Sequence, residues 1–250
     1  MNPETGHLDP ADLENLLDDK VRLVCFPHCS NVVGEINPVV EITALAHAAG
    51  AYTCVDGVSY APHGLPDIGR LGCDIYLFSA YKTYGPHQGI MVIRRDLGEA
   101  LPNQGHFFNA GNPAYRFTPA GPDHAQVAAC AGIVDYMETL ADHHGIAGVP
   151  PAGVGAAVQR LMRAHETALL QPLLDYLDAR GDVRLLGPTV AELRAPTVAV
   201  ALDRPGEAVA AELAAHGIMA GGGNFYAVRP LEAMGVDRHG EVLRLSFVHY

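Results

Sequence analysis

The chain has 250 residues, with 16 Lys and Arg against 28 Asp and Glu and a formal net charge of -12. This acidic balance argues against nucleic acids and anionic membranes as partners, because both are bound through clustered basic side chains. A composition that is 49% hydrophobic and 18% charged is typical of a globular chain with a sizeable core. The apolar runs fall well short of the ~20 residues of a membrane helix, and the polar first ten residues do not resemble a secretory signal.

Three amino-acid types are informative through their number. The five Cys contain no C-x-x-C pair, which predicts neither a disulfide framework nor a thiolate zinc site and favours a reducing cytoplasm. The 13 His show no ligand spacing, so no metal site is expected. Lys20 and Lys82 are the only lysines. A lysine in a structured, apolar setting therefore stands out.

The first half of the chain alternates apolar strands with helical segments. Strands are predicted at Val21–Pro27, Ala51–Val55, Asp74–Ser79 and Gly89–Ile93. Between them, a helix is expected from Pro38 to Gly50 and a helical turn at Ile68–Leu71. This order predicts an α/β fold with a mainly parallel sheet that is buried on both faces.

The second half has a different pattern. A loop-rich stretch, Leu101–Pro122, is long enough to be functional or to lie at an interface. The elements that follow are expected to be helices at Val127–Leu140, Ala156–Ala179 and Glu207–His216, strands at Val183–Leu186, Thr197–Leu202 and Val242–Phe247, and a flexible turn at Gly221–Gly223. The Gly/Pro/Ala-rich segment Gly145–Gly155 reads as a boundary. We therefore divide the chain into a large domain, residues 1–145, and a small α+β domain, residues 146–250.

Lys82 follows directly after a predicted parallel strand, in the segment Ser79-Ala80-Tyr81-Lys82. Ligands of open α/β sheets bind outside the carboxyl ends of the strands. Desolvation by Tyr81 and Tyr84 would lower the pKa of the Lys82 amine and make it a nucleophile towards a carbonyl group. The alternative is an ordinary solvated loop lysine.

Asp56 ends the preceding strand, so neighbouring strands would bring Asp56 and Lys82 to the same edge. A buried carboxylate needs a cationic or hydrogen-bonding partner. The protonated pyridine nitrogen of pyridoxal phosphate (PLP) is such a partner when a lysine holds the cofactor aldehyde. The alternative for Asp56 is a turn-forming Asp-Gly pair. Ser30 and Asn31 end the first strand and either bind a ligand or satisfy turn backbone groups.

Three ordered segments resemble the class V aminotransferase and cysteine desulfurase family of PLP enzymes. They read HCSNVVGEINPV (28–39), AHAAGAYTCVDGVSYAPH (46–63) and GCDIYLFSAYKTYGPHQGIMV (72–92). The resemblance covers most of the chain. It implies the PLP-dependent transferase fold type I, PLP as cofactor and an amino acid as substrate.

The resemblance also implies roles for single residues. Lys82 matches the lysine that binds the cofactor covalently and serves in catalysis. Asp56 matches the aspartate at the pyridine nitrogen, and Asn31 matches an asparagine near the phenolic oxygen. Ser79 matches a phosphate ligand.

Three further positions follow from the same likeness. Tyr81 stands in place of the histidine that often precedes the lysine, and Ser59 stands where desulfurases usually have a glutamine. Arg244 matches the arginine that clamps the substrate carboxylate, a contact that suits bidentate hydrogen bonding.

The chain departs from the desulfurase pattern in one important respect. The loop Gly221–Ala227, before the arginine strand, has no Cys, and no Cys follows Cys130 anywhere in the chain. The chain thus resembles the subgroup without the catalytic Cys, and transamination, C–S lysis and epimerisation remain open as its reaction.

N-terminal and extreme C-terminal parts of the family pattern are not found in this sequence. One alternative is therefore a catalytically incomplete remnant or a partner-dependent fragment. Another is a protein-binding module without a cofactor. The resemblance further implies a homodimer, in which Asn112 and Arg116 would reach the neighbouring subunit.

Overall fold

The computed structural model describes residues 1–118, 121–146, 148–236 and 242–248. Its first sheet has the strand order β1 (Leu23–Pro27), β2 (Tyr52–Asp56), β3 (Ile75–Ser79) and β4 (Gly89–Ile93). The first three strands are parallel, and β4 is antiparallel to β3. Residues 80–88 are too few for a crossover, so β4 returns beside β3 as an antiparallel neighbour. The expected α/β fold is confirmed, with an antiparallel edge strand.

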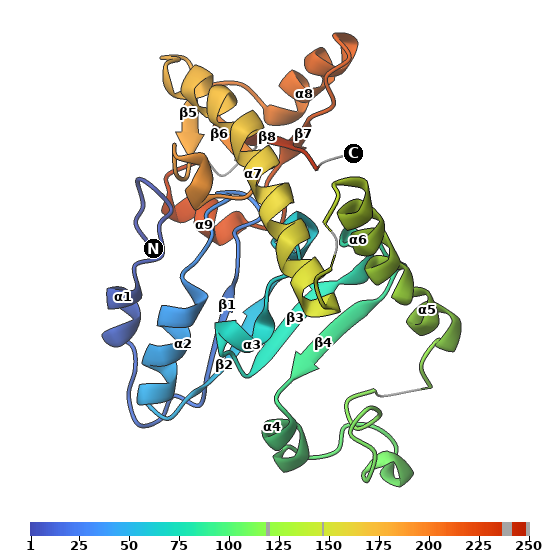
Figure 1. Ribbon diagram of the computed structural model, residues 1–250. Coiled ribbons are helices and arrows are strands. Elements are labelled where there is room, and N and C mark those ends of the chain that lie inside the picture. The colour runs from blue at the N-terminus through green and yellow to red at the C-terminus, as the bar shows by residue number, and fades with distance from the viewer. Residues whose placement is uncertain (119–120, 147, 237–241, 249–250) are drawn as a thin grey trace.

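Helices cover one face of this sheet (Figure 1). Helix α2 (Val39–Ala48) follows Pro38 and ends before Gly50, whose φ of 76° suits a left-handed helix stop. Val39 packs with Val55, Tyr76 and Phe78 of the sheet, and α3 (Ile68–Leu71) adds further apolar contacts. This face is the core of the first half.

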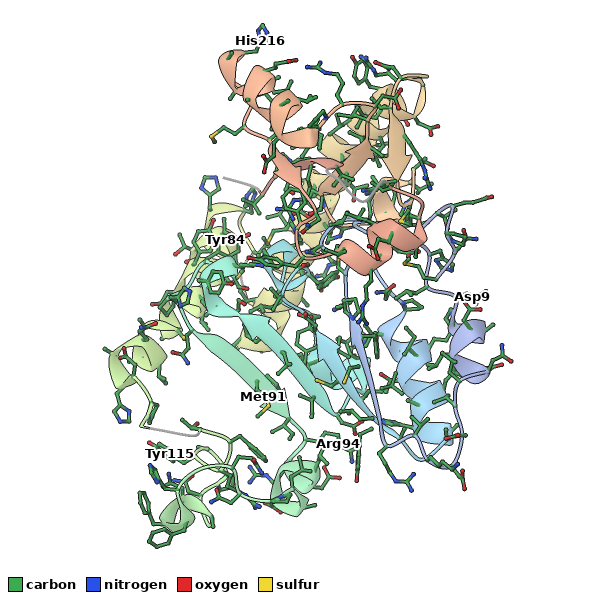
Figure 2. The ribbon with its side chains drawn as sticks, turned by 180° about the vertical axis from the view of Figure 1, so that it is seen from behind. Asp9, Tyr84, Met91, Arg94, Tyr115 and His216 are labelled. Carbon is green, nitrogen blue, oxygen red and sulfur yellow. The ribbon has the colours of Figure 1, made fainter. Side chains whose placement is uncertain are left out.

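The opposite face of the sheet is largely open. Leu23, Tyr52 and Met91 lie in β1, β2 and β4, and they are 49%, 48% and 41% exposed. Seen from behind, no helix lies in front of β3 and β4, and Met91 is on this side (Figure 2). The expectation of a sheet buried on both faces is therefore wrong for this chain, because no described segment packs over that side.

The second sheet is antiparallel and has the order β5 (Arg184–Leu186), β6 (Thr197–Ala201), β8 (Val242–Ser246) and β7 (Gly221–Gly223). The glycine segment is thus an edge strand and not the flexible turn that the sequence suggested. A side chain does not fit at Gly222, because a Cβ there would lie 2.1 Å from the backbone N of Glu207. Glycine allows α8 (Gly206–Ala215) to pack closely on β7.

The second sheet has a core on each side. The long helix α7 (Pro151–Asp178) packs on one side through Leu170 and Leu174, together with α8. Helix α9 (Val228–Ala233) covers the other side, where Val32 and Val33 of the loop after β1 join the core. The two sheets are therefore linked by shared apolar packing.

Several shorter elements complete the described chain. They are α1 (Pro10–Glu14), η1 (Ala61–His63), η2 (Ala80–Lys82), α4 (Arg95–Ala100), η3 (Phe107–Asn109), α5 (His124–Ala129), α6 (Ala131–His143) and η4 (Ala191–Leu193). The helix expected at Val127–Leu140 is divided at Cys130. Helix α7 begins at Pro151, inside the expected boundary Gly145–Gly155, because Pro is well suited to the first helical position. The division at residues 145 and 146 stays a prediction.

Arg116 does not project from its loop. Its Nη1 donates to Glu99 O at 3.0 Å, and its Nη2 donates to Leu101 O. These carbonyls lie at the C-terminal end of α4, where a cation also interacts favourably with the helix dipole. The reach of Arg116 and Asn112 to a neighbouring subunit stays a prediction.

A buried polar cluster joins α7 to the loop after β2. His63 Nδ1 lies 2.7 Å from Glu166 Oε1, and Arg163 Nη1 donates to Glu166 Oε2 at 3.3 Å. Glu166 is almost fully buried. Arg194 lies just before β6 and is fully buried. Its guanidinium donates to the carbonyls of Leu186, Pro188 and Thr197.

We predict that Glu166→Ala destabilises the chain by about 3–5 kcal/mol, because it removes the carboxylate that pairs with the buried His63 and with the partly buried Arg163. Urea unfolding followed by circular dichroism measures the loss. Glu212→Ala is the control, because Glu212 pairs with Arg204 on the surface. Equal unfolding midpoints for Glu166→Ala and Glu212→Ala would contradict the structural role.

We also predict that the open sheet face makes the chain self-associate. The double substitution Leu23→Lys and Met91→Lys should reduce binding of a hydrophobic dye and light scattering several-fold, because exposed apolar patches promote association. Val40→Lys, at an exposed position on α2, is the control. Unchanged scattering of the double variant would show that this face does not drive association.

Candidate active site

The carboxyl ends of β1, β2 and β3 meet at one edge of the first sheet because these strands are parallel. Asp56 pairs in register with Pro27 of β1 and with Leu77 of β3. Register partners point to the same side of a sheet, and side chains alternate along each strand. Asp56 and Ser79, which is two residues beyond Leu77, therefore share the open face.

Asp56 is exposed at the end of β2. Its Oδ1 accepts a hydrogen bond from Val58 N at 2.9 Å, and its carbonyl accepts from His28 N at 2.8 Å. The turn expected at Asp-Gly is therefore present. Within the described ranges the Asp56 carboxylate forms no ion pair, so it remains available to a cationic ligand.

Ser59 lies in the turn at residues 58–60 that follows Asp56, and it is half-buried. The turn begins at Gly57, where a Cβ would approach the Tyr76 ring to 2.2 Å. Only glycine permits this approach. The path of the chain from Asp56 to Ser59 is therefore fixed against Tyr76.

A tight turn follows β3 and presents Lys82. Thr83 Oγ1 donates to Ser79 O at 2.9 Å, and Gly85 N donates to Ala80 O at 2.9 Å. Lys82 is exposed, and its Nζ lies 5.9 Å from the centre of the Tyr81 ring. The Tyr81 ring also stacks on His87, with centroids 4.7 Å apart.

The expected desolvation of Lys82 does not occur in this chain. Tyr81 is 48% exposed, and Tyr84 points its hydroxyl at Pro62 O, to which it donates at 2.5 Å. Lys82 is itself exposed, so its side chain stays in solvent.

Asn31 and Arg244 are brought together from the two halves of the chain. Asn31 Nδ2 donates to Phe225 O at 2.7 Å, and Arg244 Nη1 donates to Asn31 O at 3.1 Å. The Arg244 guanidinium carbon lies 3.8 Å from the centre of the Phe225 ring. Burial lowers the pKa of the half-buried Arg244. A guanidinium held in this way can offer its remaining N–H groups to a carboxylate.

The loop that positions Phe225 is locally strained. Phe225 and Tyr226 have φ values of 51° and 64°, in the left-handed region that few aromatic residues adopt. Asn224 Oδ1 accepts from Tyr226 N at 3.0 Å and supports this conformation. Tyr226 itself is fully exposed. The strain directs Phe225 onto Arg244, while the next side chain points into solvent.

Sequence reasoning missed a network centred on His28. The His28 ring stacks on Tyr60 with centroids 3.8 Å apart, and Nδ1 lies 2.9 Å from the Tyr76 hydroxyl. Burial lowers the pKa of His28 to about 4 and raises the pKa of Tyr76. The phenol therefore donates to a neutral imidazole. The available signal was the polar His28 directly after an apolar strand.

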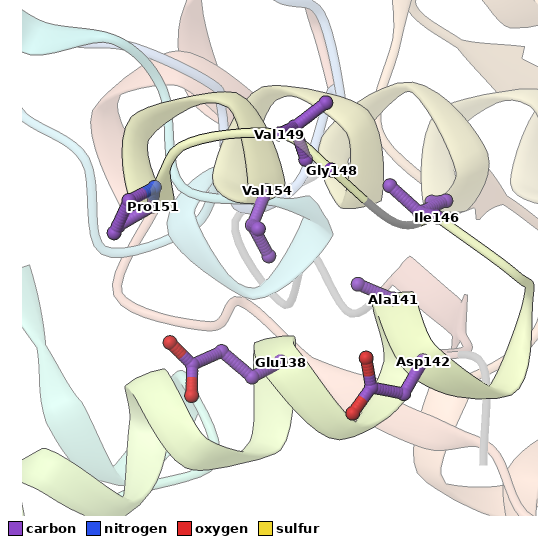
Figure 3. A pocket seen from close by; sticks show the side chains of 8 residues that line it. All are labelled: Glu138, Ala141, Asp142, Ile146, Gly148, Val149, Pro151 and Val154. Atoms are coloured by element: carbon purple, nitrogen blue, oxygen red, sulfur yellow. The ribbon is translucent and has the colours of Figure 1, made fainter.

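Two pockets in the described ranges lie away from these residues. A cavity of about 310 Å³ between α6 and the start of α7 is lined by eight residues, among them the carboxylates Glu138 and Asp142 (Figure 3). A larger apolar cavity of about 770 Å³ lies among α7, α8 and the second sheet, next to Leu173 and Met219. Neither contains any of the residues predicted for the site.

The polar groups at the sheet edge fit PLP by the chemistry of their donors. They comprise an amine at Lys82, an available carboxylate at Asp56, and hydroxyl groups at Ser59 and Ser79. An amine, a carboxylate and hydroxyls match an aldehyde, a pyridinium nitrogen and a phosphate. The structure places these residues at one edge, but it shows no contact between Lys82 and Asp56.

Comparisons with known proteins give the family. Residues 2–113 match the family model described as aminotransferase class-V. The aminotransferase-like protein FGM3 of Gibberella zeae is 32% identical, over 97% of this chain and 58% of that protein. A cysteine desulfurase of Dickeya dadantii is 33% identical, over 74% of this chain and 44% of that enzyme. The chain is a relative of the class V aminotransferases and cysteine desulfurases.

A solved structure gives the fold. The apo structure of the cysteine desulfurase from Thermococcus onnurineus NA1 matches with a TM-score of 0.75 and 24% identity, over 100% of this chain and 60% of that chain. The chain has the PLP-dependent transferase fold type I, and its relatives are PLP enzymes. It spans between two fifths and three fifths of the length of the relatives described here. None of the helices in the described ranges combines the length and apolar character needed to cross a membrane.

The His28 network predicts a pH dependence of stability. The folded pKa of about 4 lies below the unfolded value of about 6.5, so the unfolded state binds more protons between these values. Stability that is fully present above pH 6.5 is lost as the pH falls towards 4, by up to about 3 kcal/mol. Urea unfolding at several pH values measures this loss.

His28→Gln removes the titrating group and should flatten the unfolding free energy between pH 6.5 and 4.5. His216→Gln is the matched control, because His216 is exposed at the end of α8. An unchanged slope in His28→Gln would place the pH dependence elsewhere.

Proposed function

We propose that the chain is the core of a PLP-dependent enzyme that acts on an amino acid at its α-amino group. The observation that carries the proposal is the placement of Asp56 at the end of β2 and of Lys82 just after β3, with Arg244 bound to Asn31 in the loop after β1. Family membership supports the cofactor, because the relatives of this chain are PLP enzymes.

Each residue at the edge has a separate task in holding the cofactor. Lys82 would hold the PLP aldehyde through its ε-amine, and Asp56 would face the pyridine nitrogen. Ser79 would donate to the phosphate, while Ser59 and Tyr81 would flank the ring. Asn31, one N–H of which is used by Phe225, would lie near the phenolic oxygen.

The second sheet would bind the substrate through Arg244 of β8. PLP, when bound, withdraws electrons from the substrate Cα and so acidifies its proton. Arg244 would bind the substrate carboxylate, because its position against Phe225 and Asn31 O leaves part of the guanidinium fork available. Once the substrate α-amino group has replaced it on the cofactor aldehyde, the released Lys82 amine would accept the proton from Cα and return it as a general acid.

The reaction differs from that of a desulfurase that uses a loop thiol. The residues before the arginine strand are Asn224, Phe225, Tyr226 and Ala227, so no sulfur is available there to accept sulfur from a substrate. Transamination, β-elimination with C–S lysis, and epimerisation are the outcomes compatible with Lys82, Asp56 and Arg244. Incubation with L-cysteine, L-alanine and D-alanine, followed by assays for pyruvate, sulfide and the opposite enantiomer, separates them.

A second candidate is a partner-dependent fragment. The open sheet face and the exposure of Lys82 favour it, because a PLP enzyme needs a desolvated lysine and a protected ring. A homodimer and a cytoplasmic location also belong to the proposal. They rest on the family resemblance and on cysteine usage. A purified chain that retains PLP as a stable dimer would contradict the fragment candidate.

The two lysines provide a matched test of the cofactor. PLP added to the purified chain should produce a visible absorbance band that Lys82→Ala removes. Lys20→Ala should retain it, because Lys20 lies in the exposed turn before β1. Loss of the band in both variants, or in neither, would contradict the role of Lys82.

A further inference from the structure

Two cysteines lie side by side on adjacent strands of the first sheet. Cys25 of β1 and Cys54 of β2 are register partners in the parallel pair. Partners in register point to the same side, which here is the open face that also carries Asp56. Cys25 is exposed and Cys54 is half-buried. Reagents in solution therefore reach the pair.

The backbone spacing is compatible with a disulfide. Adjacent strands lie about 4.8 Å apart, within the span of about 4.4–6.8 Å between the Cα atoms of bonded cysteines. The position of Cys25 also affects Cys54. Burial raises the pKa of Cys54, and the neighbouring Cys25 thiol raises it further.

The other cysteines have no register partner among the paired strands, and they differ in reactivity. Burial raises the pKa of Cys29 to about 12 and that of Cys73 to about 11, so both stay protonated and unreactive. Cys130 donates its thiol hydrogen to Gln126 O in its own helical segment. Within the described ranges, Cys25 and Cys54 are the pair placed for bond formation.

We propose that Cys25 and Cys54 form a reversible redox site, a thiol pair that low-molecular-weight disulfides such as oxidised glutathione convert to a disulfide between β1 and β2. The sequence predicted no disulfide framework, and this pair is different in kind. An exposed bond between neighbouring strands is labile and not a structural staple.

The exchange proceeds in two steps that balance. The Cys25 thiolate, the more accessible of the two, attacks oxidised glutathione, whose S–S bond breaks as one glutathione thiolate leaves. The Cys54 thiol then loses its proton to solvent and attacks the Cys25 sulfur, which releases the second glutathione thiolate. The protein loses two electrons and two protons, and one oxidised glutathione becomes two reduced molecules.

The site is independent of the proposed PLP chemistry. It needs only the β1–β2 register, and its readout is the mass and thiol content of the chain. Failure of PLP binding would leave this inference untouched, and absence of the disulfide would leave the role of Lys82 untouched.

The experiment treats the reduced chain with oxidised glutathione, blocks free thiols with N-ethylmaleimide and measures mass. The number of thiols titrated after denaturation should fall from five to three. Digestion with chymotrypsin and a glutamyl endopeptidase cuts after Glu35 and Tyr60 and so places Cys54, Cys73 and Cys130 on different peptides. Cys25 and Cys29 stay on one peptide, because Pro27 blocks cleavage after Phe26, and fragmentation of the linked peptide tells these two apart. The linked peptide should join Cys25 to Cys54, and dithiothreitol should reverse the link.

Single variants identify the order of attack. Cys54→Ala should accumulate a stable glutathione adduct on Cys25, whereas Cys25→Ala should react at least tenfold more slowly. Cys130→Ala is the control and should behave as the wild type. A wild-type chain that carries only glutathione adducts, or a linked peptide that joins other cysteines, would overturn the proposal.

Discussion

The parallel pairing of β1, β2 and β3 is the constraint on which the candidate site depends. Parallel strands bring all their carboxyl ends to one edge, so residues far apart in sequence become neighbours. The register of Asp56 with Pro27 and Leu77 fixes which side chains share a face. A shift of one residue in this register would turn Asp56 towards α2 and remove it from the site.

The second sheet contributes through a small number of contacts. Arg244 reaches the loop after β1 by binding Asn31 O, and Val32 and Val33 of that loop enter the core beneath β8. The buried Glu166 ties α7 to the loop after β2. The position of Arg244 relative to the strand ends is therefore set by packing and by buried hydrogen bonds at the junction between the sheets.

Much of the fold was predictable from local patterns, because short apolar runs bounded by Gly, Pro and Asp mark strands and their ends. The strand at Gly89–Ile93 was placed correctly, but its antiparallel direction depends on the short connection from β3. Gly221–Gly223 lacks any strand-forming side chain, and its pairing depends on the close approach of α8. Such tertiary causes are not visible in a local pattern.

The candidate site divides in the same way. Asn31, Asp56 and Lys82 stand out because they come at or after predicted strand ends, whereas Ser79 was chosen from the family resemblance, and their roles stay predictions. The exposure of Lys82 and the inward turn of Arg116 depend on which surfaces are covered, and no single segment contains that information. The pairing of Cys25 with Cys54 likewise required the register, since 28 residues of other structure separate them in sequence.

The most direct measurement is chemical trapping of the cofactor. Borohydride reduction of the chain with PLP, followed by peptide mass mapping, should place a pyridoxyl group on Lys82 and leave Lys20 unmodified. A label on Lys20, an equal label on both lysines, or no label at all would contradict the assignment of the strand-end lysine as the residue that holds PLP.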